Sequence, residues 1–394
     1  MAVLAYAWPA ARIAPRDLPV GIVGTSAASQ GAVEGLAHSK PGAFDFRLYP
    51  DESSARSAIR ERDVYGAFAV TPGSLTVLES TAASPTVAQL LDNTGRLLAA
   101  KASKAAADRA ASAAHGTPAH SKGAKGAKGA KATKGAEAGA KKPAQIRVTA
   151  VDVVRISPDD PRGVVFSSAL LPLTICSIIL ALATMALRLR PVARLTVLIV
   201  MSGAAALGVY VVAQGFLGAL PHGHLATWAS LALTVLAISA TTAGAVTLVG
   251  SAGLGPSAAL MVFVGNPFSG STSAPELLPK AVDDIGQWLP PGAGASLVRG
   301  TAYFDGNGGA GPIAVLALWS LLGLAAVLFG HRAAPLVKGP GTGRNATSDA
   351  QDPAPDATEL HVPPPSEEPA HPSSPVTIVR HTHSHSHARH AAGA

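Results

Sequence analysis

The chain has 394 residues, of which 48% are hydrophobic and 14% charged, with a formal net charge of +7 at pH 7. This length allows two or more domains, and the apolar content excludes a chain that is disordered throughout. Lys, Arg, Asp and Glu crowd into residues 10–162 and 276–394. Basic residues on both sides of an apolar block indicate membrane orientation, so we expect no nucleic-acid partner.

The first segment, residues 1–14, starts with apolar residues and reaches a proline at Pro9. A membrane-spanning helix needs about 20 apolar residues, and the start of a signal peptide is basic. We interpret this segment as the remnant of a first transmembrane helix. The alternative is a short segment that rests on the membrane surface.

Residues 15–162 have the pattern of an α/β domain, which we expect to be extracytoplasmic. Its order is βαβαββα followed by one more strand, because alternating apolar runs are separated by turn residues and helical periods. We expect Asp51 to cap the second helix and Pro85 to start the third. The predicted strands are 18–23, 44–48, 64–70, 75–79 and 146–156, and the predicted helices are 26–37, 51–60 and 85–100.

A Lys/Gly/Ala-rich insertion, residues 101–145, interrupts this domain and repeats Gly-Ala-Lys from Gly123. It has almost no bulky residue to bury, so we expect disorder or partial helix. It serves either for adhesion to an anionic surface or as a tolerated low-complexity insertion.

Residues 195–275 contain no Lys, Arg, Asp or Glu. A charge at the centre of a membrane helix costs roughly 2.5 to 3.5 kcal/mol, so a charge-free run of this length indicates membrane. Residues 163–331 are therefore predicted to form an α-helical membrane bundle of five full transmembrane helices, with the truncated N-terminal helix as a sixth. The expected spans are 164–187, 195–217, 225–249, 254–265 and 313–329.

Arginines supply the topology signals. Arg188, Arg190 and Arg194 separate the first two full spans, and Arg332 follows the last. The positive-inside rule puts both clusters in the cytoplasm, which requires the short fourth segment to cross the membrane. The α/β domain and a loop over 266–311 then lie outside, and an amphipathic helix over 277–289, anchored by Trp288, lies at the outer interface.

The tail, residues 332–394, is rich in Pro, Ser and His, and we expect it to be disordered and cytoplasmic. Its histidines are weak candidates for binding Zn, Ni or Cu, because no cysteine or ordered scaffold fixes their geometry. The alternative is a plain low-complexity tail. These residues are His381, His383, His385, His387 and His390.

Catalytic motifs are missing from the sequence. No phosphate-binding Gly-x4-Gly-Lys-Ser/Thr run exists, and Gly306, Gly308 and Gly311 open a predicted span without the acidic residue that holds a ribose. We expect no cofactor and no enzymatic activity. The single Cys176 is interpreted as a small buried apolar residue, and Asp159 with Asp160 as a cap and hinge where the outer domain meets the membrane.

Polar side chains within the spans are candidates for a transport path. Gln214, Thr241 and Thr242 are the leading ones, with Ser202, Thr234 and Ser239 beside them. Serine and threonine also hold transmembrane helices together by hydrogen bonding, and we favour that interpretation.

Two groups of short motifs stand out in the chain. In its first half they are Ala7-Trp8-Pro9, Pro15-Arg16-Asp17-Leu18-Pro19-Val20 with Gly24, Tyr65-Gly66-Ala67-Phe68, Ala82-Ala83-Ser84-Pro85 with Leu90-Leu91, and Asp159-Asp160-Pro161-Arg162-Gly163. Later ones are Gly265-Asn266-Pro267-Phe268-Ser269-Gly270, Pro275-Glu276-Leu277-Leu278-Pro279, Leu289-Pro290-Pro291-Gly292-Ala293, and Arg299 with Tyr303-Phe304-Asp305-Gly306. As a set these motifs resemble the YhgE/Pip type of bacterial membrane protein, within the type-2 ABC transporter permease clan. The resemblance covers most of residues 1–102 and 146–331; the Lys/Gly insertion, the His-rich tail and the short first helix depart from it.

The resemblance implies a six-helix permease subunit in a bacterial plasma membrane, dimeric, that exports a substrate with energy from a separate ATPase. Its partners would then be membrane lipids, that ATPase and a second copy. The alternative is a non-transporting envelope protein whose outer domain acts as a docking or receptor surface.

Overall fold

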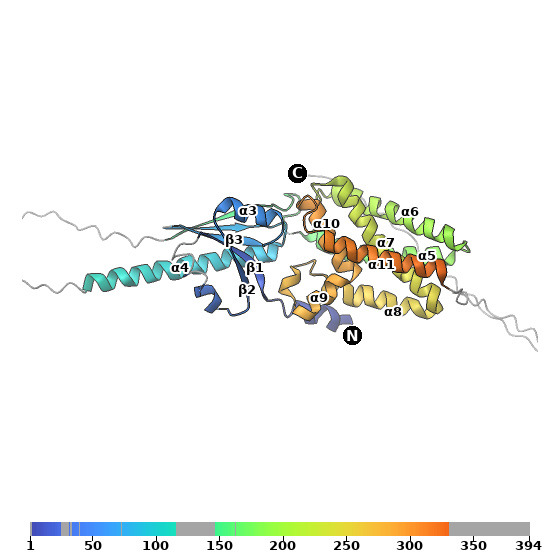
Figure 1. Ribbon diagram of the computed structural model, residues 1–394, viewed down its shortest axis with the longest axis horizontal. Helices are drawn as coiled ribbons and strands as arrows, with labels where there is room; N and C mark the ends of the chain where they lie inside the picture. The colour runs from blue at the N-terminus through green and yellow to red at the C-terminus, as the bar shows by residue number, and fades with distance from the viewer. Residues whose placement is uncertain are drawn as a thin grey trace, which may run out of the picture. The chain divides into compact units, whose positions relative to one another are not determined.

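A computed structural model describes residues 2–24, 31, 34–38, 40–71, 73–115, 146–161 and 163–330. Over this part the chain is mostly helical, with one small mixed sheet (Figure 1). Most of the predicted helix 26–37, most of the Lys/Gly insertion and the tail 332–394 lie outside the described residues.

The five-stranded sheet has the order β2-β1-β3-β4-β5. Strand β1 is parallel to β2 and to the central strand β3, β4 is antiparallel to β3, and β5 is parallel to β4. The strands are β1 (Leu18–Val23), β2 (Phe44–Tyr49), β3 (Gly66–Thr71), β4 (Ser74–Glu79) and β5 (Arg147–Asp152), so each predicted strand is present within a few residues.

Two helices cover opposite faces of this sheet. Neighbouring strand residues point to opposite faces, so Ala67 packs with α3 (Glu52–Arg60) and Phe68 with α4 (Pro85–His115). Asp51 caps α3 as predicted, since its carboxylate accepts a hydrogen bond of 2.8 Å from the Ser54 backbone N–H.

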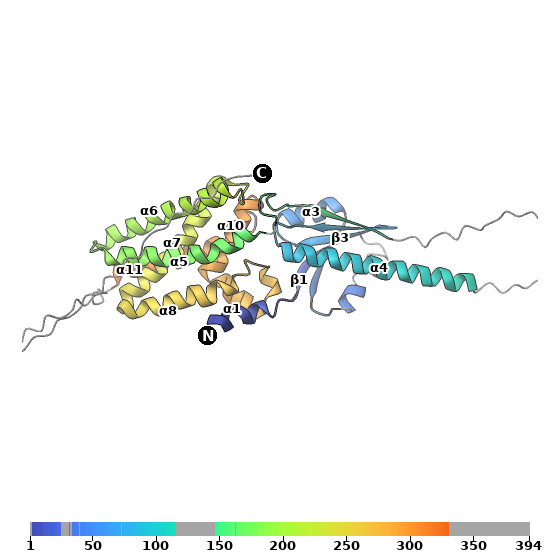
Figure 2. The same ribbon diagram turned by 180° about the vertical axis from the view of Figure 1, so that it is seen from behind.

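The third predicted helix is much longer than expected. It was predicted to end near Ala100, but α4 continues through the start of the insertion to His115 (Figure 2). The stretch after Ala100 is dominated by alanine, which has the highest intrinsic helix propensity, and no glycine or proline interrupts it before Gly116. Of the two expectations for the insertion, disorder or partial helix, residues 101–115 therefore follow the helical one.

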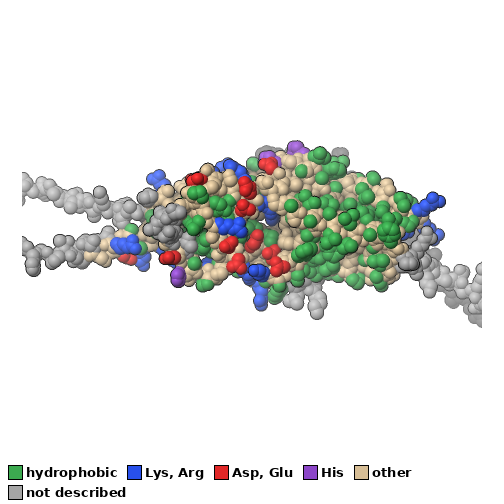
Figure 3. Space-filling view, in the orientation of Figure 1, with side chains coloured by type: hydrophobic (Ala, Val, Ile, Leu, Met, Phe, Trp, Pro, Cys, Tyr) green, Lys and Arg blue, Asp and Glu red, His purple; other side chains and the backbone are tan. Residues whose placement is uncertain are grey.

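The rest of the described chain forms a helical bundle. Four stretches are long and apolar enough to cross a membrane: Val164–Ala186, Pro191–Phe216, His224–Gly265 and Ala310–Phe329. They contain α5 (Val164–Ala186), α6 (Pro191–Tyr210) with the π-helical η1 (Val211–Phe216), α7 (His224–Val249) with its continuation, and α11 (Ala310–Phe329). In Figure 3 hydrophobic side chains cover this part of the surface, whereas Asp and Glu gather over the sheet.

The direction of each helix follows from its contacts with the central helix α7. The Tyr210 hydroxyl at the end of α6 lies 2.5 Å from His224 at the start of α7, whereas Leu198 near the start of α6 packs with Ala243 further along α7, so α6 runs antiparallel to α7. Gly323 of α11 packs on Gly244 and Leu316 on Ala237, so α11 runs parallel to α7. Helix α5 is parallel to α7 as well, since residues of increasing number in α5 pack in the same hydrophobic clusters as residues of increasing number in α7.

The structure has four such stretches where the sequence predicted five full spans. The third and fourth predictions fall in one stretch, His224–Gly265, which turns back at the 3-10 helix η2 (Gly250–Gly253). Ser257 donates a hydrogen bond of 3.1 Å to the Thr242 hydroxyl, and Met261 packs with Ile238, so the returning arm is antiparallel to α7. That arm is only 12 residues long, six in α8 and six in η3, which is too short for a full span of about 20 residues.

Cys176 is exposed on α5, so its interpretation as a buried residue is wrong. It lies on the same side of the helix as exposed Ile175 and Ile179. An apolar run does not distinguish the buried side of a helix from its outer side, which is why the sequence misplaced this residue.

Candidate functional site

The chain between α7 and α11 is the most irregular part of the bundle. Because α7 and α11 run in the same direction, this chain has to return along the height of the bundle. It does so in two pieces instead of one helix. The elements are α8 (Leu254–Ala259), the π-helical η3 (Leu260–Gly265), the 3-10 turns η4 (Pro267–Ser269) and η5 (Pro275–Leu277), α9 (Lys280–Trp288) and α10 (Pro290–Tyr303).

The two pieces meet inside the bundle. Gly265 ends the first piece, and a Cβ there would lie 2.7 Å from Cγ of Pro291, at the start of α10. Helix α10 then runs antiparallel to the first half of α7, since Gly294 packs on Thr234 and Thr301 on Gly223. All its residues are buried. Residues 266–289 are thus inserted where the two half-length pieces adjoin.

A hydrogen bond from α1 (Ala2–Ala10) satisfies a backbone carbonyl that this break leaves free. The Asn266 backbone N–H donates to the Met261 carbonyl at 3.1 Å, five residues back, and the next residue, Pro267, has no N–H. The Val262 carbonyl therefore receives no intrahelical partner, and the Tyr6 hydroxyl donates to it at 2.9 Å.

A pocket of about 340 Å³ opens at the break, between α1, the start of α5 and residues 266–278. We call it the loop pocket. One part of its lining is hydroxyl or amide and the other apolar, and none of the lining side chains is charged. The lining residues are Tyr6, Pro9, Ala10, Ile13, Ser167, Ser168, Leu171, Asn266, Pro267, Gly270, Ser271, Thr272, Ser273 and Leu278.

Buried polar contacts fix the loop against the sheet domain and α10. The Tyr65 hydroxyl donates to the Glu276 carboxylate at 2.5 Å, and the Arg16 guanidinium donates to the Leu277 carbonyl at 2.8 Å. On the bundle side, buried Arg299 donates to the Ser271 carbonyl at 2.9 Å and stacks over the Phe166 ring at 4.8 Å. The loop is therefore held from two sides.

The Tyr65 phenol stays neutral. Burial raises the pKa of Tyr65 well above its usual range, and the nearby Glu276 carboxylate raises it further. A neutral phenol keeps its proton and can donate it to the Glu276 carboxylate.

A second, more polar hollow of about 180 Å³ lies next to this contact and is lined by Arg62, Tyr65, Glu276 and neighbouring residues. Arg62 also donates to the Ser296 carbonyl of α10 at 3.1 Å and lies 5.5 Å from the Phe304 ring. The charged side chains that line this hollow already form contacts that join the sheet domain to the bundle. We therefore assign the hollow a structural role.

Asp160 caps α5, as the sequence predicted for the entry of the outer domain. Its two carboxylate oxygens accept hydrogen bonds of 2.9 Å from the backbone N–H groups of Val164 and Val165. Beside it, the Ser157 hydroxyl donates to the Gly218 carbonyl at 2.6 Å, which ties the end of the sheet domain to the turn before α7.

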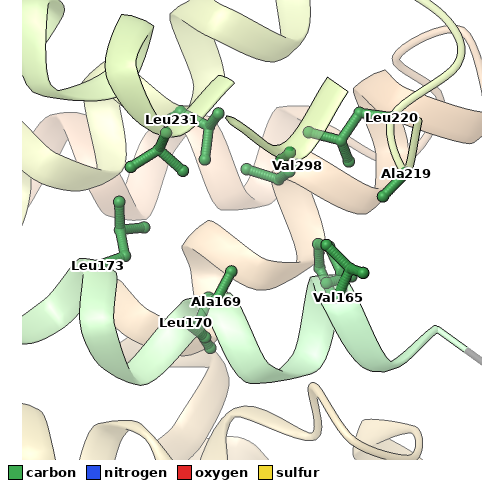
Figure 4. A pocket seen from close by; sticks show the side chains of 11 residues that line it. Val165, Ala169, Leu170, Leu173, Ala219, Leu220, Leu231 and Val298 are labelled. Atoms are coloured by element: carbon green, nitrogen blue, oxygen red, sulfur yellow. The ribbon is translucent and has the colours of Figure 1, made fainter. Parts of the chain in front are cut away.

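The interior of the bundle has one further hollow, of about 30 Å³, among α5, α7, α10 and the turn before α7 (Figure 4). Leu173, Leu231, Val298 and Leu220 face it, and its lining contains no polar side chain. A space of this size and lining fits about one water-sized sphere but offers it no hydrogen bond. It does not form a polar path.

The predicted path residues are not brought together. The Gln214 carboxamide oxygen accepts from the Leu220 backbone N–H at 2.8 Å, in the turn at one end of the bundle. Thr241 donates to the Ala237 carbonyl and faces α11, whereas Thr242 donates to the Ile238 carbonyl and faces α8. These contacts are typical of side chains that join helices, the interpretation favoured from the sequence.

The arginines of the topology prediction lie between α5 and α6. Arg188 and Arg190 are exposed, and Arg194 is half-buried with an Nε that has no hydrogen-bond partner among the described residues. Arg332 and the weak metal candidates His381, His383, His385 and His387 lie outside the described residues. No group of three or more metal-ligating side chains is found in the part of the chain that is described.

Sequence reasoning missed α10, because Pro290-Pro291 with Gly292 was interpreted as part of a loop. Proline is favourable at the first positions of a helix, and residues 290–298 carry no charge, so the signal was present. It also gave Asn266 no role of its own, because this residue was named only within a motif and as the start of the predicted loop. The predicted amphipathic helix is α9, and the Trp288 carbonyl accepts a hydrogen bond of 2.8 Å from the Trp319 indole.

No protein-family model, curated protein or solved structure matches this chain.

Proposed function

We propose that this chain is the membrane-spanning, permease-like subunit of an ABC-type export system whose energy comes from a separate ATPase. The proposal joins the motifs that resemble the type-2 permease clan to one structural observation. That observation is the broken return between α7 and α11, with buried irregular backbone at residues 266–289.

Broken helices support transport for a physical reason. In a bilayer, backbone N–H and C=O groups without partners are costly, so non-helical backbone occurs there only where it is buried in protein or lines a cavity. Secondary transporters use such interrupted helices for substrate sites, because the freed groups and the loops beside them can bind a ligand. Here the interruption adjoins the loop pocket.

The proposed orientation keeps the sheet domain outside the cell and the C-terminus in the cytoplasm of a bacterium. It is supported by the location of Arg188, Arg190 and Arg194 at the end of α5 opposite Asp160 and the sheet domain. With this orientation α9 and the start of α11 lie toward the outer side.

The apolar interior of the single bundle indicates where a path would form. The hollow in Figure 4 has no polar side chain in its lining, and Thr234, Thr241 and Thr242 bond to their own helices, so these parts of the described bundle supply no polar route. We therefore propose a homodimer in which the route lies between two copies or along the side of the bundle.

Purification of the tagged, intact chain from its native membranes tests the partner. We expect an ATPase subunit among the proteins that co-purify, identified by mass spectrometry, and the ATPase activity of the complex should respond to membrane extracts. If the chain repeatedly purifies without any ATPase, the export proposal is contradicted and the docking or receptor role of the sheet domain is favoured.

Cysteine labelling tests the orientation separately. In a Cys176→Ser background, Ser53→Cys on α3 should react with a membrane-impermeant maleimide in intact cells. Leu187→Cys, at the other end of α5, should react only after permeabilisation. The reverse pattern would invert the proposed sidedness.

A further inference from the structure

We propose that the loop pocket binds the uncharged, hydroxyl-rich head of an amphiphile, such as a glycosylated or polyol lipid, whose hydrocarbon chain lies along the outer face of α5. If the chain is an exporter, as proposed above, this inference names the class of its substrate, and only that part of it rests on the proposed function. The pocket itself does not depend on an ATPase.

The pocket offers mainly hydrogen-bond acceptors. Ser167, Ser168 and Ser273 each donate their hydroxyl proton to a backbone carbonyl, so what they retain is the lone pairs of the oxygen. The Asn266 amide nitrogen lies 3.4 Å from the Thr174 hydroxyl and donates to it. The Asn266 carboxamide oxygen accepts no hydrogen bond from any described residue. A ligand that fits this pattern brings donors.

Charge decides between donor-bearing head groups. A phosphate buried here would carry its negative charge without a cationic partner, because none of the lining side chains is charged. An ammonium group buried here would lack a carboxylate partner, and an unpaired buried charge is costly. Neutral hydroxyl groups meet neither penalty, because each can donate to one of these oxygens.

The hydrocarbon chain has a surface directly below the pocket. Starting at Ser168, an exposed face of α5 continues through Pro172, Ile175 and Ile179, spaced by three or four residues. This face rises about 16 Å along the helix at 1.5 Å per residue. The head pocket and an apolar track are thus continuous, the pairing that an amphiphile needs.

The pocket is built into the fold. Gly270 adopts a φ of +65°, and a Cβ there would lie 2.7 Å from the Pro275 backbone nitrogen, so only glycine permits this turn. Arg299 holds the Ser271 carbonyl from behind, and Tyr6 closes the α1 side through its bond to Val262. The pocket therefore exists before a ligand binds.

Native mass spectrometry of the full chain tests this proposal. The protein is extracted in a polyoxyethylene detergent, because sugar detergents would compete, and placed in nanodiscs of dioleoyl phosphatidylglycerol and glucosyl-dioleoylglycerol in equal amounts. After delipidation we expect the glucosyl lipid to be retained roughly tenfold over the phospholipid, which is the effect of one or two net hydrogen bonds.

Two variants locate the binding. Ser168→Trp fills the pocket from an exposed position and should abolish the preference, whereas Thr196→Trp, exposed on α6, should leave it unchanged. Thr272→Val removes an exposed hydroxyl and should lower retention about fivefold. Equal retention of both lipids, or a preference that survives in Ser168→Trp, would overturn the inference.

The outcomes separate this inference from the proposed function. Selective retention by a chain that has no ATPase partner would leave a lipid-binding site in a protein that is not an exporter. An ATPase partner with no selective retention would leave the exporter and refute the pocket assignment.

Discussion

The sheet domain and the helical bundle differ in how many large apolar side chains each leaves on its surface. Leu18, Ile22 and Phe68 are fully buried between the strands and α4, and among the described residues of this domain only Leu48 and Leu97 are large, apolar and exposed. In the bundle the closest approaches use small residues, such as Gly244 against Gly323 and Gly294 against Thr234. This difference is expected if the sheet domain is solvated by water and the bundle by lipid.

Water drives the burial of large apolar side chains, which contribute about 25 cal/mol for each Å² removed from it. Lipid gives no such gain, because hydrocarbon tails are as apolar as leucine, so helices associate through close backbone packing and small residues. Many large hydrophobic residues of the bundle accordingly remain on its surface, among them Phe216 and Phe329, which are 82% and 77% exposed.

The largest expected effect is in the sheet domain. Phe68 is only 1% exposed, and Phe68→Ala leaves a cavity between β3 and α4 that should cost about 3–5 kcal/mol of unfolding free energy. Limited proteolysis and urea unfolding of the detergent-solubilised protein should show the sheet domain opening first. Leu48→Ala, at an exposed residue of β2, is the control.

The second effect tests close packing in the bundle. A Cβ on Gly323 would lie 2.3 Å from the backbone carbonyl carbon of Ala240, so Gly323→Val must push α11 away from α7. We expect about 3 kcal/mol of destabilisation and a large loss of monodisperse protein in detergent, measured by size-exclusion chromatography.

Gly208→Val is the matched control, since Gly208 lies within α6 and no atom lies within 4 Å of the position that its Cβ would take. If both valine variants behave alike, helix propensity and not packing explains the result, and the contrast between the two regions loses its basis.

The smallest effect concerns pH and the sheet domain alone. Burial, and then the neighbouring Asp152 carboxylate, raise the pKa of Glu79 from 4.5 to about 7. The folded state thus holds a proton that the unfolded state releases, so stability falls as pH rises from about 4.5 to about 7. Glu79→Gln should raise the midpoint of thermal unfolding at pH 8 by about 2 °C, and by less at pH 5.

The same change at exposed Glu61 serves as control, measured by differential scanning fluorimetry across this pH range. An equal shift in both variants, or a shift at pH 5 as large as at pH 8, would show that Glu79 does not hold the proton.

Local sequence patterns predicted most of the sheet domain. Alternating apolar residues marked β1 to β4, and the Asp51 cap needs only the first turn of α3, so neither depends on distant contacts. The predicted end of α4 near Ala100 was wrong because the low-complexity segment after it was treated as a separate insertion, while its alanines favour continuation of the helix.

The candidate site was less accessible to sequence reasoning. The motif around Asn266 was noted, but its partners Tyr6, Ser168 and Arg299 are far away in the chain. The proposed path through Gln214 and Thr242 relied on polarity alone, which does not tell whether a hydroxyl bonds to its own helix or faces a cavity.

The sequence by itself determined which segments are apolar enough to cross a membrane and which form the sheet, because these depend on local composition and period. Only the tertiary structure decided that 254–265 folds back on α7, that α10 is buried, and that a pocket lies at their junction. The physical reason is that hydropathy is a local property, which indicates whether a segment prefers water or lipid. A cavity forms where segments that are distant in the sequence do not pack fully against one another, so it depends on the tertiary structure.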